Sequence, residues 1–146
     1  MNLVAAILSA MAFASLAHAG TQDPSWCAEP GDRPAHCDRR THGLMLWPPH
    51  GKIPFSRRYN LTVADVPRDE IPEICDRLWW GLNRWGMTCD TWSHGDKPYC
   101  RAASDNSTTL EWWFETSMLC DPWKVHGAWW HATENKYGGV WCCKLD

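Results

Sequence analysis

Hydrophobic and polar positions alternate in two stretches of the chain, and this period of two predicts strands. Residues 59–63 alternate in this way. Residues 108–116 do so more clearly, with Leu110, Trp112 and Phe114 on one face. Because successive side chains of a strand point to opposite faces, each stretch would bury one of its faces in a core.

Two other stretches carry apolar residues at spacings of three and four, which is the period of an amphipathic helix. In residues 69–85 the apolar positions are Ile71, Ile74, Cys75, Leu78, Leu82 and Trp85. A second helix is predicted to begin at Asp121-Pro122, a typical helix start, and to end before Gly138-Gly139. Its apolar positions are Val125, Ala128, Trp129 and Ala132.

Two shorter strands complete the predicted order of elements, one within residues 86–101 and one at residues 140–143. The order is then strand, helix, strand, strand, helix, strand, which makes two βαβ units in succession. Because such crossovers are right-handed, both helices would lie on one face of a four-stranded sheet. The prediction is an α+β fold, a disulfide-stabilised sandwich over residues 58–146. Residues 20–57 hold six prolines, which remove backbone donors, and are predicted to form an irregular arm.

The chain begins with an expected export signal. Residues 3–16 carry no charge and are mostly apolar, and they lead to Ala17-His18-Ala19, a small-x-small pattern that signal peptidase accepts. We expect cleavage after Ala19, which would remove residues 1–19. No second apolar run is long enough to span a bilayer about 30 Å thick. The sequence therefore predicts a secreted, extracellular protein without stable membrane insertion.

All of the cysteines follow this segment, at Cys27, Cys37, Cys75, Cys89, Cys100, Cys120, Cys142 and Cys143. An even number of cysteines in an exported chain points to four disulfides, because the secretory pathway oxidises thiols. The sequence alone leaves about a hundred pairings open. Zinc is not expected, since no CxxC or HxxxH pair accompanies the cysteines.

The adjacent cysteines near the C-terminus should have different partners. In a strand, Cys142 and Cys143 would point to opposite faces, one of them into the helix layer. Cys75 is the candidate partner on the helix side. Either Cys27 or Cys37 is the candidate on the other side, which would fold the proline-rich arm across the open face of the sheet.

Length and charge narrow the possible partners. The 146 residues suit one domain, and a net charge of −3 provides no field that would hold nucleic acid. Asn60 and Asn106 begin acceptor sequences for N-glycosylation, which mark surface positions in an exported eukaryotic protein. We expect at least one of them to be occupied, and we expect the protein to be a monomer.

No catalytic motif is present. The chain has no GxSxG, HExxH or P-loop sequence, so the sequence favours a protein that is not an enzyme and has no catalytic residue, cofactor or metal. The alternative from the enzyme class is a secreted ribonuclease-like hydrolase. It would use His126 or His131 with Glu111, Glu115 and Arg101 as acid, base and phosphate ligand.

Tryptophan is the most unusual component, with 12 residues, six of them in the doublets 79–80, 112–113 and 129–130. Each doublet should place one ring inward and leave the other outside. Trp80 and Trp130 fall off the predicted core stripes, while Trp113 and Trp141 would share the open face of the sheet. Exposed indoles mark a binding surface or a covered interface. These four residues are the predicted binding residues, with a lectin-like module that stacks sugars as one alternative and cover by the arm or a glycan as another.

The short signal, the eight cysteines, the two βαβ units and the terminal YGGVWCC resemble the small secreted cysteine-rich effector candidates of plant-associated fungi. The topology predicted over residues 58–146 is similar to that of the killer-toxin-like α/β-sandwich effectors. This resemblance implies release into the host apoplast or into host cells, and a role in virulence or in antagonising competitors as a killer-type toxin. It also implies action by binding, with a host protein or cell-wall glycan as the expected partner, and no catalysis.

Overall fold

The computed structural model describes residues 23–24, 27, 34–45, 51–92 and 95–145. The predicted export signal lies outside the described residues. The chain divides into two compact units, residues 1–30 and residues 31–146, and the fold below is that of the second unit. Among the described residues, no helix has both the length and the apolar character needed to cross a membrane.

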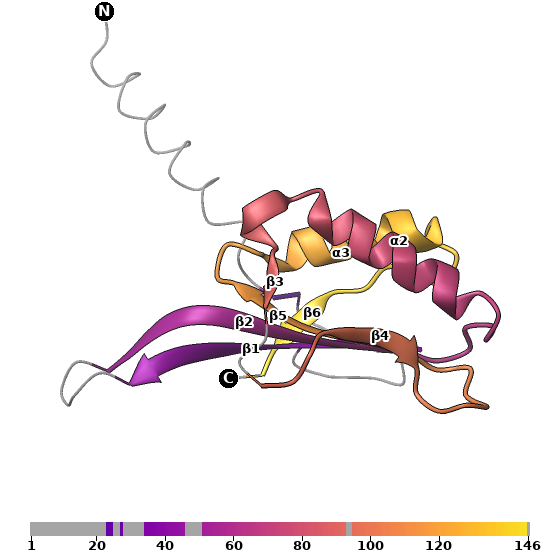
Figure 1. The fold of residues 1–146 in the computed structure, drawn as a ribbon, viewed down its shortest axis with the longest axis horizontal. Coiled ribbons are helices and arrows are strands. Elements are labelled where there is room, and N and C mark those ends of the chain that lie inside the picture. Colours follow the sequence, from indigo (N-terminus) through magenta and orange to yellow (C-terminus); the bar gives the residue numbers. More distant parts are fainter. Residues whose placement is uncertain (1–22, 25–26, 28–33, 46–50, 93–94, 146) are drawn as a thin grey trace, which may run out of the picture. The chain divides into compact units, whose positions relative to one another are not determined.

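Six strands and two helices make up the described part of this unit. They are β1 (Ala35–Met45), β2 (Lys52–Val63), α2 (Ile71–Asn83), the short 3-10 helix η2 (Gly86–Thr88), β3 (Thr91–Trp92), β4 (Tyr99–Ala102), β5 (Leu110–Ser117), α3 (Pro122–Thr133) and β6 (Cys142–Lys144). The strands form one mixed sheet, and both helices lie on the same face of it (Figure 1). The predicted α+β class is confirmed.

The sheet has the order β3-β5-β2-β1-β6, and β4 also pairs with β5. Among the described strands, β1 and β6 pair in parallel and the other pairs are antiparallel. The strands β2 and β4 therefore run in the same direction with β5 between them. The predicted four-stranded sheet is wrong for two reasons. The strand β1 was not expected, and residues 86–101 contribute two short strands rather than one.

The predicted irregular arm is also wrong over most of its described length. Residues 35–45 and 52–57 form β1 and the first half of β2, and the two strands pair as an antiparallel hairpin. The prolines occupy positions that a hairpin tolerates: Pro34 precedes β1, and Pro54 lies opposite Gly43, where the register shifts. The expected boundary at residue 58 thus falls inside β2.

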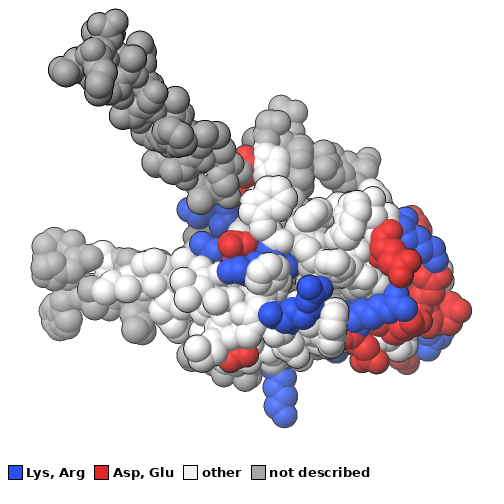
Figure 2. Space-filling model, turned by 90° about the horizontal axis from the view of Figure 1, so that it is seen from above, with Lys and Arg blue, Asp and Glu red and all other residues white. Residues whose placement is uncertain are grey.

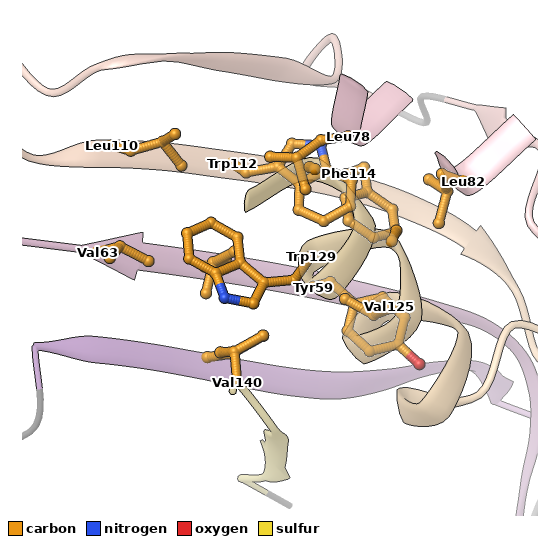
Figure 3. Close-up of a cluster of buried hydrophobic side chains, with 14 of the residues drawn as sticks. Tyr59, Val63, Leu78, Leu82, Leu110, Trp112, Phe114, Val125, Trp129 and Val140 are labelled. Carbon is orange, nitrogen blue, oxygen red and sulfur yellow. The ribbon is translucent and has the colours of Figure 1, made fainter. Parts of the chain in front are cut away.

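The core lies between the sheet and the helices (Figure 3). The side chains that β5 and β2 send toward the helices are buried, as the alternation predicted. Phe114 packs against both Trp112 and Tyr59, with ring centroids 4.6 and 5.2 Å apart. The two helices approach closely, because a Cβ added to Gly81 would lie only 3.1 Å from the Cα of Ala128.

Every cysteine is in a disulfide, and none is free among the described residues. The described bonds are Cys37–Cys142, Cys75–Cys100 and Cys89–Cys120, and Cys27 and Cys143 are bonded as well. The prediction that Cys142 and Cys143 have different partners is confirmed.

Cys37, one of the candidate partners of the adjacent cysteines, does bond to one of them, but on the helix side of the sheet, where Cys75 was the candidate. Cys142 bonds to Cys37, because β1 lies next to β6 and their Cα atoms are 4.4 Å apart. Cys75 instead bonds to Cys100 on β4, the strand that contacts α2. Cys37 is buried on the helix side of the sheet, so it does not tie an arm to the opposite face.

Candidate functional site

Four tryptophans of the described residues are exposed, and all of them belong to the helices or to the turns at their ends. Trp80, Trp85, Trp123 and Trp130 have exposed fractions between 46% and 63%. The doublets explain two of them, because one residue step turns a helix by about 100°. While Trp129 is fully buried, its neighbour Trp130 faces outward; likewise Trp79 is partly buried against the core, and Trp80 faces outward.

An aromatic row follows the outer side of α3. Trp123 and Trp130 are seven residues apart, about two helical turns, so they lie on the same side of the helix. His126 lies between them, with its ring centroid 5.9 Å from that of Trp123 and 6.4 Å from that of Trp130. Trp141 packs edge-on against Trp123 at 4.7 Å, and the ring of His126 is bonded to the carbonyl of Val140 at 2.7 Å. The segment before β6 therefore supports this row from below.

Lys124 lies at the start of α3, one residue after Trp123, and contacts the turn after α2. The ammonium group of Lys124 donates to the carbonyl of Leu119 at 2.6 Å and lies 5.7 Å from the ring centroid of Trp85. Asp121 caps the helix, because its carboxylate accepts from the backbone N–H of Lys124. The side chain of Lys124 thus connects the turn after α2, through Trp85, with the loop that leads into α3, through Leu119.

Two apolar side chains are exposed to solvent in the loops where α2 ends and α3 begins. Met87 is 86% exposed and Leu119 is 66% exposed. Ser117 fixes the loops that carry them, because its hydroxyl donates to the carbonyl of Thr88 and accepts from the N–H of Leu119. The disulfide Cys89–Cys120 joins the same two loops. We call Trp85, Met87, Leu119, Trp123 and Trp130 together the aromatic surface.

Charged side chains gather at the opposite end of the helix layer, where α2 begins and α3 ends (Figure 2). Glu70 accepts from Lys136 at 2.6 Å and from Tyr137 at 2.7 Å, which lowers the pKa of the Glu70 carboxyl. Arg77 pairs with Glu73 one turn earlier on α2. The ion pairs of Glu70 and Arg77 thus lie at one end of the helix layer, and the exposed aromatic side chains Trp85 and Trp123 lie at the other.

The sheet face opposite the helices has a different character. It carries a hollow of about 290 Å³ lined by Asp38, Arg40, Arg58, Tyr59, Asn60 and Trp113. Trp113 is half-buried and stacks nearly parallel to Tyr99, with centroids 6.1 Å apart. Arg58 is held beside Trp113 by an ion pair of 3.2 Å with Glu115, which is buried and also accepts from Ser56.

The structure separates the four predicted binding residues. Trp80 is exposed on α2, where its ring lies 5.1 Å from the guanidinium of Arg84. Trp113 lies on the sheet face opposite the helices. The prediction that Trp141 shares this face is wrong, because β6 begins only at Cys142 and Trp141 is buried against Trp123. Only Trp130 belongs to the aromatic surface.

Most of the aromatic surface was missed from the sequence. Trp123 could have been found, since it stands one heptad before Trp130 in the predicted helix. Trp85, Met87 and Leu119 could not, because a disulfide pairing that the sequence leaves open brings their loops together.

The residues considered for a ribonuclease do not meet. His126 and His131 lie on α3, whereas Glu111, Glu115 and Arg101 lie on the other side of the sheet. The residues that the structure describes also hold no group of three or more His, Cys, Asp or Glu suited to a metal ion. In comparisons with protein-family models, curated proteins and solved structures, no match to this chain is found.

Proposed function

We propose that this chain is an exported, disulfide-stabilised protein of effector type that acts by binding a partner protein, and that the partner docks on the aromatic surface. The observation that carries the proposal is the set of three exposed indoles, one exposed methionine and one exposed leucine on α3 and on the two loops that the disulfide Cys89–Cys120 joins. Large apolar side chains gathered in water are uncommon on soluble monomers and mark interaction sites. Covering each half-exposed indole would contribute roughly 2–3 kcal/mol.

The composition of the aromatic surface fits a binding hot spot. Tryptophan and methionine are enriched at the centres of protein interfaces, where charged residues are depleted. Lys124 lies between Trp85 and Leu119 with its ammonium group bonded, so it contributes an apolar stem and a satisfied charge. The charged end of the helix layer would then form part of the polar rim.

The loops of the aromatic surface are ordered before any partner arrives. The disulfide Cys89–Cys120 and the hydrogen bonds of Ser117 fix the positions of Met87 and Leu119 relative to each other. A partner would therefore lose little affinity to loop ordering, which typically costs about 0.5–1.5 kcal/mol per immobilised side chain. Because the disulfide fixes these loops in advance, it supports the proposal that the aromatic surface binds a partner.

The proposed place of action follows from the disulfides and from the resemblance to fungal effectors. Disulfides persist in oxidising compartments, and all the cysteines of this chain are bonded. A partner that meets the folded protein would therefore be an extracellular protein, or one reached after translocation into a host cell. Plant apoplastic fluid is the first place to look for it.

The test is affinity capture from plant apoplastic fluid with oxidised protein of residues 20–146. Wild type is compared with Trp123→Ser/Trp130→Ser, and Trp80→Ser is the matched control, because it removes an equally exposed indole outside the aromatic surface. Circular dichroism establishes that all three samples are folded. The proposal predicts a protein retained by wild type and by Trp80→Ser and lost from the double variant. Equal retention by all three samples would place the binding site elsewhere.

A further inference from the structure

The hollow opposite the helices contains an acceptor for N-glycosylation. Asn60 begins the sequence Asn-Leu-Thr and is exposed in the middle of β2, while Leu61 points into the core. In the sheet register Asn60 lies opposite Asp38 on one side and opposite Trp113 on the other, and Trp113 lies opposite Tyr99. One cross-strand row therefore joins a carboxylate, the acceptor amide and two stacked aromatic rings.

The surroundings of Asn60 suit the first sugar of a glycan. Directly opposed residues of an antiparallel pair have Cβ atoms about 4.5–5.5 Å apart, so a sugar on the Asn60 amide starts beside the indole of Trp113. Aromatic faces pack against the C–H face of a sugar ring, and charged groups bond its hydroxyls. Arg40 lines the same hollow and is placed to bond those hydroxyls, and so is Asp38, one of whose oxygens lies 3.0 Å from the ring of His36; Arg58 is already paired with Glu115.

We propose that, when the chain is made in a glycosylating secretory pathway, Asn60 carries an N-linked glycan whose first N-acetylglucosamine lies in the hollow against Trp113. The donor is an oligosaccharide linked to a lipid pyrophosphate. The bond between Asn60 Nδ2 and the sugar C1 forms, Nδ2 loses one proton, and the bond from C1 to the lipid pyrophosphate breaks. Transfer occurs on the unfolded chain, and folding then closes the sheet around the sugar.

The second acceptor provides an internal control. Asn106 lies in the exposed turn after β4, where the N–H of Ser107 donates to the carbonyl of Ser104. Its side-chain oxygen is 3.4 Å from the guanidinium of Arg68, and the hollow nearby is lined by Arg68, Arg101, Ala102, Ala103, Ser104 and Asp105, without an aromatic ring. A glycan on Asn106 therefore has no indole to lie against and extends into water.

Filling the hollow would leave the two faces of the protein with separate roles. The glycan on Asn60 would cover Trp113, the one predicted binding residue on the sheet face opposite the helices. The aromatic surface, on the helix side, would remain free for a partner. This inference does not rest on the proposed partner binding, and either can fail alone.

The experiment uses the full chain secreted from a yeast or insect host. Glycopeptide mapping should find Asn60 occupied. Peptide N-glycosidase applied to the native protein should release the Asn60 glycan about tenfold more slowly than the Asn106 glycan, because stacking must first be broken. After denaturation the two rates should be equal.

Variants then assign the protection to the hollow. Trp113→Ala should bring the native release rate at Asn60 up to that at Asn106. Arg40→Ala, which changes an exposed side chain and leaves the core intact, should raise the rate in the same direction if Trp113→Ala is not secreted. Trp80→Ala, on the other face, should leave the ratio unchanged. An unoccupied Asn60, or equal native release from Asn60 and Asn106 in wild type, would overturn the proposal.

Discussion

Because the two helices approach closely, replacing a glycine by alanine should change the free energy of unfolding in opposite directions at Gly81 and at Gly127. Gly81 of α2 is buried against α3, and a Cβ built on it would lie 3.1 Å from the Cα and 3.2 Å from the Cβ of Ala128. Gly127 lies one residue before Ala128, inside α3, and a Cβ built on it meets nothing within 4 Å. The same substitution, glycine to alanine, therefore tests packing at one site and helix propensity alone at the other.

The expected changes in the free energy of unfolding follow from helix propensity and from packing. Replacing glycine by alanine inside a helix stabilises the fold by about 0.5–1 kcal/mol, so Gly127→Ala should raise the free energy of unfolding by that amount. At Gly81 the same gain is opposed by overpacking against backbone, which typically costs about 1–3 kcal/mol. The difference between the two variants isolates the packing term. It should be about 1–3 kcal/mol, with Gly81→Ala the less stable.

The assay compares thermal and urea unfolding of both variants with that of wild type. Unfolding is monitored by circular dichroism, and the disulfides are kept intact. In a domain of this size each kcal/mol moves the midpoint temperature by about 3–4 °C. Gly81→Ala should melt below Gly127→Ala by several degrees with an unchanged urea m-value. If both variants were stabilised equally, α2 and α3 would not be packed through Gly81, and the helix layer described above would be wrong.

Three further predictions concern single groups. Burial raises the pKa of Tyr59 to about 12, above its unfolded value, so the free energy of unfolding should hold up to about pH 10 and fall by about 3 kcal/mol toward pH 12. Tyr59→Phe should remove this fall in urea titrations, and an unchanged pH profile would count against it. Cys89→Ser/Cys120→Ser opens a bond spanning 31 residues and should cost about 3–4 kcal/mol in calorimetry, whereas a loss below 1 kcal/mol would contradict a disulfide that fixes these loops. Hydrogen bonds from Lys136 and Tyr137 lower the pKa of Glu70, so the stability they provide should disappear as pH falls through that pKa, and Lys136→Met should raise the Glu70 pKa toward its ordinary value in an NMR titration, whereas an unchanged titration would count against the Lys136 contact.

Both helices could be predicted because their spacing and start signals agree with their packing. The predicted stretches 69–85 and 121–138 contain α2 and α3, and Asp121 caps α3 as its position suggested. The alternation in residues 108–116 likewise marks β5. In these segments local sequence and tertiary environment favour the same structure.

The strand β1 could not be predicted from composition. Its hairpin with β2 keeps its prolines at the ends and at a register shift, which a proline count does not distinguish from an irregular arm. That added strand separates β2 from β6, and it puts Cys37 rather than Cys75 beside Cys142 on the helix side of the sheet. The missed strand thus accounts for part of the error in the sheet and for the different helix-side disulfide partner.

The candidate site was predictable only where it follows helix geometry. Trp130 was identified from its place off the core stripe, and Trp123 has the same signal. The remaining members of the aromatic surface lie in two loops that the disulfide Cys89–Cys120 joins. Their proximity depends on long-range pairing, which spacing along the chain does not encode.

The central claim, that the aromatic surface is the binding face, is tested most directly by calorimetric titration of the captured partner. Wild type, Trp123→Ala and Trp80→Ala would be titrated in parallel at equal salt concentration. The account predicts a dissociation constant at least about 30-fold weaker for Trp123→Ala, as for a hot-spot residue, and one within about threefold of wild type for Trp80→Ala. An unchanged dissociation constant for Trp123→Ala would contradict it.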